Sequence, residues 1–422
     1  MLGVWGAGLF TACSTPLDAT VTPSSRVPAA DLRWTSEEPT RAWLEYSYEG
    51  SPLIRSESES VARREHRFVL AGVPPGADVE WRAVWGEGRR EQSTWQSWRS
   101  PQIPIPDDAP VAQVSDNPNP GYYSLPAEDD TIWVVDAAGA PVWWWELGAP
   151  RAIARVRLLG DRVWFSYRDE LTDDAWLSSV GLDGSTPTEE LLDHHHDFLV
   201  FPDREVYLRR VSGTGGDGEP WAGDELVERE SGVERVVWST FDDVSFEQFG
   251  STYYNEGLDW THCNGILYEP EEEVYWVSSR HQEAFFVVDR QGELIRVVGG
   301  PQSTFTLVGG ENFGRIHVPV LDQDLLYLFD NTRDDNHRPR AEVYRLDWDA
   351  QTYTLHETYE RRGYNPEVHG NVSPTPDGGM MVAFGIAGLV DVLDADRELV
   401  LSVEKDALLY PDYLPTLSAP VE

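Results

Sequence analysis

The chain has 422 residues, 73 of them acidic and 33 basic, so its formal net charge is −40. A negative field of this size repels nucleic acid and anionic membranes, which argues against nucleic-acid binding. The only lysine is Lys405 and no Gly-rich phosphate loop occurs, so Schiff-base and P-loop chemistry are disfavoured as well. The 18 Trp and 17 Tyr favour sheet over helix, because flat aromatic rings pack well on pleated strands.

Residues 1–19 form the first predicted segment, a signal-like stretch followed by a polar tether. An apolar run ends in Ala12 and Cys13, and Ser, Thr, Pro and Asp follow. This pattern resembles the end of a bacterial lipoprotein signal, although no basic residues precede the apolar run. It implies an exported, periplasmic or cell-surface protein, anchored through a lipid on Cys13. The alternative is a plain apolar N-terminus.

Residues 20–106 are predicted to form a small β-sandwich. Polar and apolar residues alternate in residues 42–48 and 79–85, as in half-buried strands. The connector at residues 70–78 (Leu-Ala-Gly-Val-Pro-Pro-Gly-Ala-Asp) resembles the strand-to-strand turn of fibronectin type III domains. Residues 107–120, after a proline-rich stretch, are predicted to be a linker.

Residues 121–422 contain a unit that recurs every 45 to 60 residues or so, the span of a propeller blade. Each unit has an apolar strand ending in Asp, a short turn and a second apolar strand. Clear copies begin near Ile132, Phe286 and Val392, and weaker copies raise the number of units to six. The fold class is therefore all-β: a six-bladed β-propeller preceded by a fibronectin-like sandwich.

Histidines occupy the same place in four successive units, just ahead of a hairpin pattern. They are His196, with His195 beside it, then His262, His317 and His369. If the units close radially, these side chains gather around one axis. The repeat therefore predicts a ring of imidazoles at one mouth of the propeller.

The hairpin that follows His262 adds two polar residues to this ring. His262 and Asn264 are two positions apart, so on a regular strand both point to the same face. Arg280 ends the next strand and should return to the same edge. Imidazole, carboxamide and guanidinium together predict an anion-binding pocket. A metal site is the rival reading of a histidine ring, but Arg280 and the lack of acidic neighbours beyond Asp197 disfavour a cation.

Several motifs in this order resemble the arylsulfotransferase family, the PAPS-independent aryl-sulfate sulfotransferases. They are His-x-Asn at 262–264, Ser-Ser-Arg-His-Gln at 278–282, Val-Asp-Arg-x-Gly-Glu at 288–293, Val-Gly-Gly at 298–300 and Phe-x-x-x-His at 313–317. His195-His196-Asp197 with Phe-Pro-Asp at 201–203 resembles an earlier family motif. The sequence departs from the family at Gly265, where Ser is common, and at residues 202–205, which lack a Gly-Asn turn.

The resemblance implies a propeller that moves a sulfuryl group from an aryl sulfate to a phenol. It assigns His317 as the nucleophile, His262, Asn264 and Arg280 as groups that hold the sulfuryl oxygens, and His195 or His196 as a further pocket residue. His369 is a candidate substrate-binding residue by its place in the repeat. The implied partners are a small aryl sulfate and a phenol, with no cofactor and no metal.

Two other function classes remain open at this stage. The propeller could be a non-catalytic module that displays a ligand- or protein-binding surface. The same pocket could also serve a lyase or hydrolase that acts on another anionic ester. Only the transferase must form a covalent sulfo-histidine and pass its sulfuryl group to a phenol.

Overall fold

The computed structural model describes residues 14–421, apart from residues 87–90, 116–120, 149–150, 170, 216–217, 246–251, 255–256, 311 and 333–337. Regular structure in these residues is almost entirely strand, with one helical turn, α1 (Thr240–Asp243), and one 3-10 turn, η1 (Gly385–Ala387). No helix among them is long and apolar enough to cross a membrane. The prediction of an all-β chain is confirmed; Cys13 lies outside the described residues.

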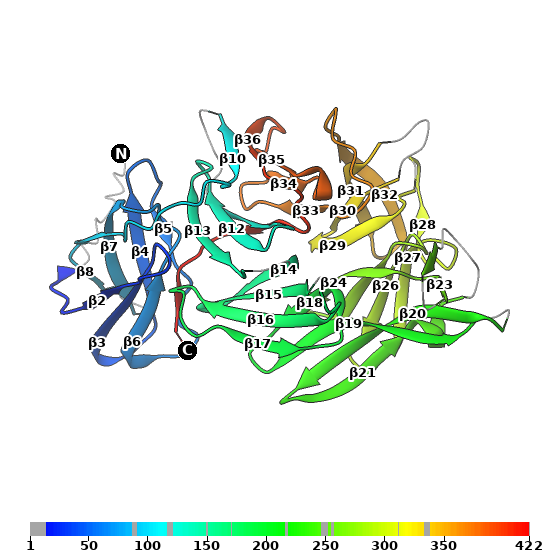
Figure 1. Cartoon of the computed structure of the whole chain (residues 1–422), viewed down its shortest axis with the longest axis horizontal. Helices are drawn as coiled ribbons and strands as arrows, with labels where there is room; N and C mark the ends of the chain where they lie inside the picture. The colour runs from blue at the N-terminus through cyan, green and yellow to red at the C-terminus, as the bar shows by residue number, and fades with distance from the viewer. Residues whose placement is uncertain are drawn as a thin grey trace, which may run out of the picture.

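Two sheets at the N-terminal end pack face to face as a β-sandwich (blue in Figure 1). One sheet contains β1 (Ser14–Thr15), β8 (Glu91–Ser93), β7 (Asp78–Trp85), β4 (Ala42–Tyr48), β5 (Ile54–Arg55) and, paired with β7, β9 (Gln96–Arg99). The other contains β2 (Thr20–Pro23), β3 (Ala30–Thr40), β6 (Arg63–Leu70) and β38 (Ala419–Pro420). Their inward side chains, among them Leu32, Leu44 and Trp81, form one buried cluster. The specific likeness to fibronectin type III stays a prediction.

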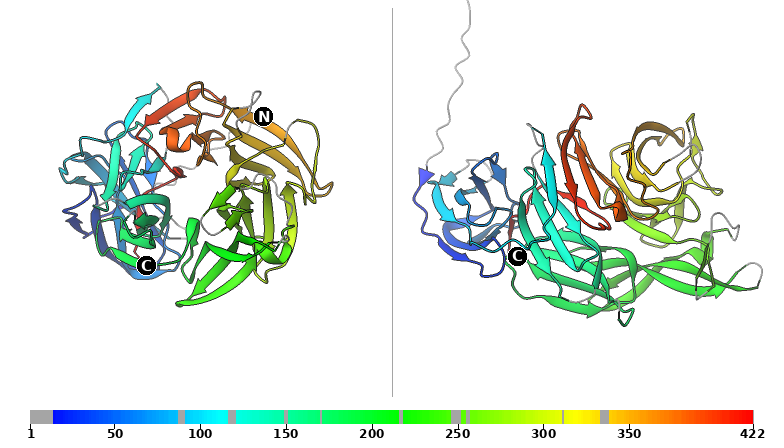
Figure 2. Two further views of the ribbon diagram at one scale, coloured as in Figure 1. Left: turned by 45° about the vertical axis from the view of Figure 1, so that its right-hand side comes forward. Right: turned by 45° about the horizontal axis from the view of Figure 1, so that its top comes forward.

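The rest of the chain forms six sheets arranged in a ring (Figure 2, left), so the predicted six-bladed propeller is confirmed. The strands of each sheet are given from the axis outward. The first sheet contains β37 (Asp412–Leu414), β11 (Tyr122–Pro126), β12 (Thr131–Asp136) and β13 (Pro141–Glu146), and the second contains β14 (Arg151–Leu159), β15 (Arg162–Asp169), β16 (Ala175–Gly181) and β17 (Thr188–Leu191). The third contains β18 (His195–Val200), β19 (Arg204–Thr214), β20 (Pro220–Glu230) and β21 (Val233–Ser239), and β23 (Gly257–Asp259) and β22 (Thr252–Tyr254) extend it beside β20.

The last three sheets follow the same order. The fourth sheet contains β24 (Cys263–Glu269), β25 (Val274–Ser279), β26 (Ala284–Asp289) and β27 (Leu294–Gly299). The fifth contains β29 (Ile316–Asp322), β30 (Leu325–Asp330), β31 (Arg340–Asp347) and β32 (Thr352–Tyr359), with β28 (Thr306–Leu307) beside β32. The sixth contains β33 (Asn371–Pro374), β34 (Met380–Ala383), β35 (Leu389–Leu393), β36 (Leu399–Glu404) and β10 (Val111–Val114).

Strands from the two ends of the chain close the ring. The late strand β37 pairs with β11 as the innermost strand of the first sheet. The early strand β10 pairs with β36 as the outermost strand of the last sheet. The segment predicted as linker, residues 107–120, thus contains a propeller strand. Beyond β37, β38 leaves the propeller and pairs with β6 of the sandwich.

Packing between neighbouring sheets explains why the central strands carry continuous apolar runs. Every residue of β12 and of β25 is buried, because both faces of each sheet are covered by the next blade. The buried clusters therefore extend across blade boundaries; one runs from β24–β27 to β30–β32 through Trp276, Phe285 and Leu328. This packing fixes the inner strands around the axis, and their first residues form the site.

Candidate functional site

The predicted histidines meet at one cavity around the propeller axis. His195 begins β18, His262 directly precedes β24, His317 is the second residue of β29, and His369 lies two residues before β33. A cavity of about 610 Å³ is lined by these residues together with His196, Arg210 and Tyr410, among others. The four blades that carry the histidines are consecutive, so their inner strands present the same end to the cavity.

The inner strands are distorted at this end. A register shift occurs between His195 and Phe198 in β18, between Cys263 and Gly265 in β24, and between His317 and Val320 in β29. Three of the histidines also have left-handed backbone angles: His196 (φ 58°), His262 (φ 47°) and His369 (φ 63°). Such conformations cost about 1–3 kcal/mol each and concentrate at functional sites. In regular strands these imidazoles would point between the blades. The bulges turn them toward the propeller axis.

His317 is almost fully buried, with 1% of its surface exposed. Its ring centroid lies 6.1 Å from those of His369 and Tyr410. The backbone N–H of His369 donates to Nε2 of His317 at 3.3 Å, so Nε2 carries the lone pair and Nδ1 the proton. Burial first, and then the charges of His369, Arg280 and His262, hold the pKa of His317 well below its usual value. His317 is therefore a neutral imidazole at pH 7.

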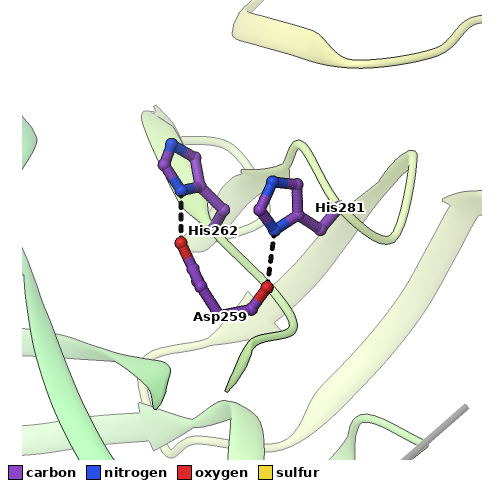
Figure 3. Close-up of side chains that lie close together, drawn as sticks. All are labelled: Asp259, His262 and His281. Atoms are coloured by element: carbon purple, nitrogen blue, oxygen red, sulfur yellow. Dashed lines mark hydrogen bonds and ion pairs between the residues drawn. The ribbon is translucent and has the colours of Figure 1, made fainter. Parts of the chain in front are cut away.

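His262 is oriented by a carboxylate. Its Nδ1 donates to Oδ2 of Asp259 at 2.6 Å, and the Arg210 guanidinium donates to the same oxygen at 3.1 Å. Figure 3 shows His262 and His281 side by side above Asp259. The bond to Asp259 places the proton on Nδ1 of His262 and leaves Nε2 as the basic nitrogen.

His195 and His196 form a second carboxylate-backed pair. Nε2 of His195 lies 3.0 Å from Oδ1 of Asp224, and its Nδ1 lies 2.8 Å from Nδ1 of His196. Burial alone would raise the pKa of Asp224, but hydrogen bonds from His195, Thr261 and the backbone of Cys263 lower it, so this carboxylate is ionised. Burial and the neighbouring histidines hold the pKa of His196 well below its usual value.

Arg280 returns to the same edge as His262, as the hairpin predicted: its backbone N–H donates to the carbonyl of His262 at 3.1 Å. One guanidinium nitrogen of Arg280 lies 2.9 Å from Nε2 of His281, whose Nδ1 donates to the carbonyl of Asp259 at 2.7 Å. Burial, followed by the charge of His262, lowers the pKa of His281 to about 4. A neutral His281 thus accepts from Arg280 and sets its direction.

Asn264 occupies a different position from the one that strand alternation predicted. The bulge in β24 turns its fully buried carboxamide toward the neighbouring blade. There Nδ2 donates to the carbonyl of Ile316 at 2.9 Å, and Oδ1 accepts from the hydroxyl of Ser278 at 2.7 Å. These bonds tie β24 to the start of β29, so Asn264 supports the position of His317.

Sequence reasoning missed four residues of the site: Asp224, Asp259, Tyr410 and the orienting role of His281. The expectation that no acidic residue beyond Asp197 lies near the histidines was wrong, because β20 and β23 bring Asp224 and Asp259 beside them. His194, next to His195 in the sequence, is buried, and its Nδ1 bonds the carbonyl of Leu192. Asp224 and Asp259 lie outside the repeat position of the histidines, so no spacing rule indicates them.

Asp259, His262 and His281 also satisfy the distance criterion for a cation site, with ligand atoms within 4.8 Å of one another. Two of these ligand atoms are joined to each other, Nδ1 of His262 and Oδ2 of Asp259. Nδ1 of His281 is bound to a carbonyl and its Nε2 faces the Arg280 guanidinium. A cation would have to displace these bonds beside a fixed positive charge, so the arrangement favours an anion.

Comparison with known proteins gives one family match. Residues 221–406, which include His262, Arg280, His317 and His369, match the model of the arylsulfotransferase (ASST) family. No curated protein matches the sequence significantly.

Solved structures share the architecture only loosely. A Bacteroides caccae protein of unknown function is 12% identical, with 70% of this chain and 99% of that one aligned and a TM-score of 0.39. A putative 6-phosphogluconolactonase from Bacteroides fragilis is 11% identical, with coverages of 90% and 99% and a TM-score of 0.37. Virginiamycin B lyase from Staphylococcus aureus is 14% identical, with coverages of 59% and 69% and a TM-score of 0.33. The description of the fold therefore relies on the strand pairing of the chain itself.

Proposed function

We propose, from the premise that residues 221–406 belong to the arylsulfotransferase (ASST) family, that this protein moves a sulfuryl group from an aryl sulfate to a phenol. The observation that carries the proposal is the environment of His317. It is a neutral imidazole that lines the cavity, in a part of the chain that matches the family. Arg280 and three further histidines from neighbouring blades surround it.

The reaction proceeds in two displacements at sulfur. Nε2 of His317 attacks the sulfur of the aryl sulfate, an N–S bond forms, and the aryl S–O bond breaks with its electron pair leaving on the phenolate. A phenol oxygen then attacks the same sulfur, and the N–S electron pair returns to His317. Because the aryl sulfate itself supplies the sulfuryl group, no nucleotide such as PAPS is needed.

The surrounding residues supply charge and proton transfer. The transition state spreads negative charge over three sulfuryl oxygens, which the Arg280 guanidinium, directed by His281, can stabilise. His262 and His196 each have a partner chain ending in a carboxylate, Asp259 and Asp224 respectively. One of them accepts the proton of the acceptor phenol in the second displacement and gives it to the phenolate that leaves in the next turnover.

The direct test is to trap the covalent intermediate. The protein is incubated with 4-nitrophenyl sulfate without acceptor, and its intact mass and peptides are measured. We expect one added SO₃ group on His317, lost when phenol is added. His317→Asn should form no adduct, whereas His356→Asn, in β32 and outside the cavity, should behave as the parent protein.

Two results would overturn the proposal. Full transfer activity in His317→Asn would remove His317 as nucleophile. A folded parent protein that releases no nitrophenol from several aryl sulfates would instead support a non-catalytic binding module.

We further propose that the protein is exported and anchored by a lipid on Cys13, on the basis of the sequence that precedes this cysteine. Metabolic labelling with a fatty acid should mark the protein and fail to mark Cys13→Ser. Equal labelling of both proteins would contradict the anchor.

A further inference from the structure

The cavity is chemically asymmetric between its floor and its rim, and this bears on the acceptor. The floor is formed by the imidazoles of His196, His262, His317 and His369, which together with Arg280 suit a sulfuryl anion. The rim consists of the exposed lining residues, which are Arg168 and the three carboxylates Glu128, Asp173 and Asp193. We infer that the acceptor is a phenol that carries a positively charged group, such as an alkylammonium, held by the carboxylates. This inference rests on the proposed sulfuryl transfer.

The wall between floor and rim suits an aromatic ring. It is lined by the small side chains of Ala152, Ala154 and Ala175 and by the apolar Leu409. Ala152 and Ala154 lie in β14, whose bulge between Ile153 and Arg155 opens the strand at this point. A flat ring can lie against such a surface without displacing a large side chain.

Two buried hydroxyls on the lining have no hydrogen-bond partner among the described residues. They are Oγ of Ser166 and the hydroxyl of Tyr410, and each side chain is 1% exposed. Buried polar groups in folded proteins are nearly always hydrogen-bonded, so these two hydroxyls are candidate partners for a polar ligand in the cavity. Tyr410 lies 5.1 Å from His369 between ring centroids, beside the floor, where the phenolic oxygen would be.

The charges at the rim do not cancel. Arg168, the cation among the rim residues, is neutralised by Asp173, with 2.7 Å between the guanidinium and carboxylate atoms. Glu128 and Asp193 are exposed and have no ion-pair partner in the described part of the chain. The backbone N–H of Glu128 donates to the carbonyl of Ala407 at 3.0 Å, which fixes the backbone at this position. Two unpaired carboxylates thus face whatever part of the acceptor leaves the cavity.

The competing explanation is that the rim only shares the acidity of the whole surface, since the chain carries a net charge of −40. A general negative field would raise the local concentration of any cation, whereas a built site depends on two particular residues. Substitution separates these explanations, because the same loss of charge can be made elsewhere.

The test compares three acceptors of similar size with 4-nitrophenyl sulfate as donor: tyramine, 4-ethylphenol and 3-(4-hydroxyphenyl)propanoate. We expect kcat/KM for tyramine to exceed that for 4-ethylphenol about 5- to 10-fold, with the propanoate poorest, since each exposed ion pair contributes modestly. The double variant Glu128→Gln/Asp193→Asn should reduce tyramine to the level of 4-ethylphenol and leave 4-ethylphenol unchanged.

The charge-matched control is Glu271→Gln/Glu273→Gln, two exposed positions in the turn between β24 and β25 and outside the cavity. It should keep the preference for tyramine. Equal kcat/KM for the three acceptors, or equal loss of preference in both double variants, would overturn the inference while leaving sulfuryl transfer intact.

Absence of transfer to every acceptor would instead count against the proposed function. The cation site is then decided by calorimetric titration of the same three phenols. Tighter binding of tyramine that is lost in Glu128→Gln/Asp193→Asn supports the site, and indifference to acceptor charge overturns it.

Discussion

The protonation state of His196 depends on a carboxylate that it does not touch. Asp224 accepts from Thr261 and from the backbone of Cys263 through Oδ2, which leaves Oδ1 for Nε2 of His195. When Nε2 of His195 carries its proton toward Asp224 and Nδ1 carries none, Nδ1 of His196 is the donor between the two rings. The lone pair of His196 is then on Nε2. Asp224 is therefore a positioning residue for a base at the cavity.

Asp224→Asn should reverse this order of donors. The amide oxygen is needed by Thr261 and Cys263, so the NH₂ group faces His195 and makes it an acceptor at Nε2. The proton moves to Nδ1 of His195, and His196 becomes protonated on Nε2. If His196 is the base, we expect kcat for transfer to fall about 10- to 100-fold with an altered pH profile and a small change in donor KM. Asp242→Asn, exposed on α1, is the control; an Asp224→Asn enzyme with the parent profile would contradict the relay.

The lowered pKa of His317 determines the pH below which the rate of the first displacement falls. A histidine whose folded pKa lies below 6.5 stays deprotonated, and hence nucleophilic, down to that lower pH. The burst of nitrophenol from 4-nitrophenyl sulfate, measured in quenched samples between pH 4 and 8, should keep its full rate at pH 6.5 and decline only below it. A half-maximal rate above pH 6.5 would mean that burial and the neighbouring charges do not lower the pKa of His317.

At the scale of the strand, the inner strands share one irregularity, a β-bulge near the end that faces the cavity. It appears in β14, β18, β24 and β29 at equivalent places, and it decides which side chains enter the cavity. Gly265 follows the bulge in β24 and permits close contact with the next blade. A Cβ built on Gly265 would lie 2.6 Å from the Cα of Val318, the residue after His317.

This contact accounts for a glycine at position 265. Gly265→Ser would push the backbone of β29 away and displace His317, and overpacking of this kind costs about 1–3 kcal/mol. We expect a lower midpoint of urea unfolding and, in the folded fraction, a lower kcat. Gly265 itself has no left-handed backbone angle, so the cost of the substitution comes from the close contact with β29. Equal unfolding midpoints for Gly265→Ser and the parent protein would show that β29 can move without loss of stability.

The sequence was informative wherever one local rule applied to every blade. The apolar runs and the position of His262, His317 and His369 repeat because each blade uses the same strand order, so spacing alone predicted a common cavity. Sequence patterns did not predict the positions of side chains that depend on a local bulge or on pairing with a strand distant in the sequence. Alternation misplaced Asn264 because a bulge follows Cys263, and Asp224 reaches His195 from the far side of a hairpin. Strand β10 pairs with β36 almost three hundred positions later, which no local pattern in residues 107–120 indicates.

For the whole molecule, both ends of the chain hold the ring closed, and the C-terminal end also joins the sandwich to the propeller. After β37, the hydroxyl of Ser418 donates to the carbonyl of Ala71 and accepts from the N–H of the same residue, each at 3.0 Å. The N–H of Val421 donates to Arg67, so the last residues extend the sheet of β6. Tyr46 and Tyr122 add a buried contact between the two domains, 3.1 Å between their hydroxyls.

Deletion of residues 416–422 should therefore uncouple the two domains without opening the propeller, because β37 ends at Leu414. We expect calorimetry to show one cooperative transition for the parent protein and two for the deletion, with the sandwich unfolding first since it loses strand β38. Transfer activity at moderate temperature should remain, as the deletion spares Tyr410 and every histidine of the cavity. Tyr46→Phe, which removes one hydroxyl of the same interface, should lower the transition temperature and keep a single transition. Two transitions already in the parent protein would show that the C-terminal strand does not couple the domains.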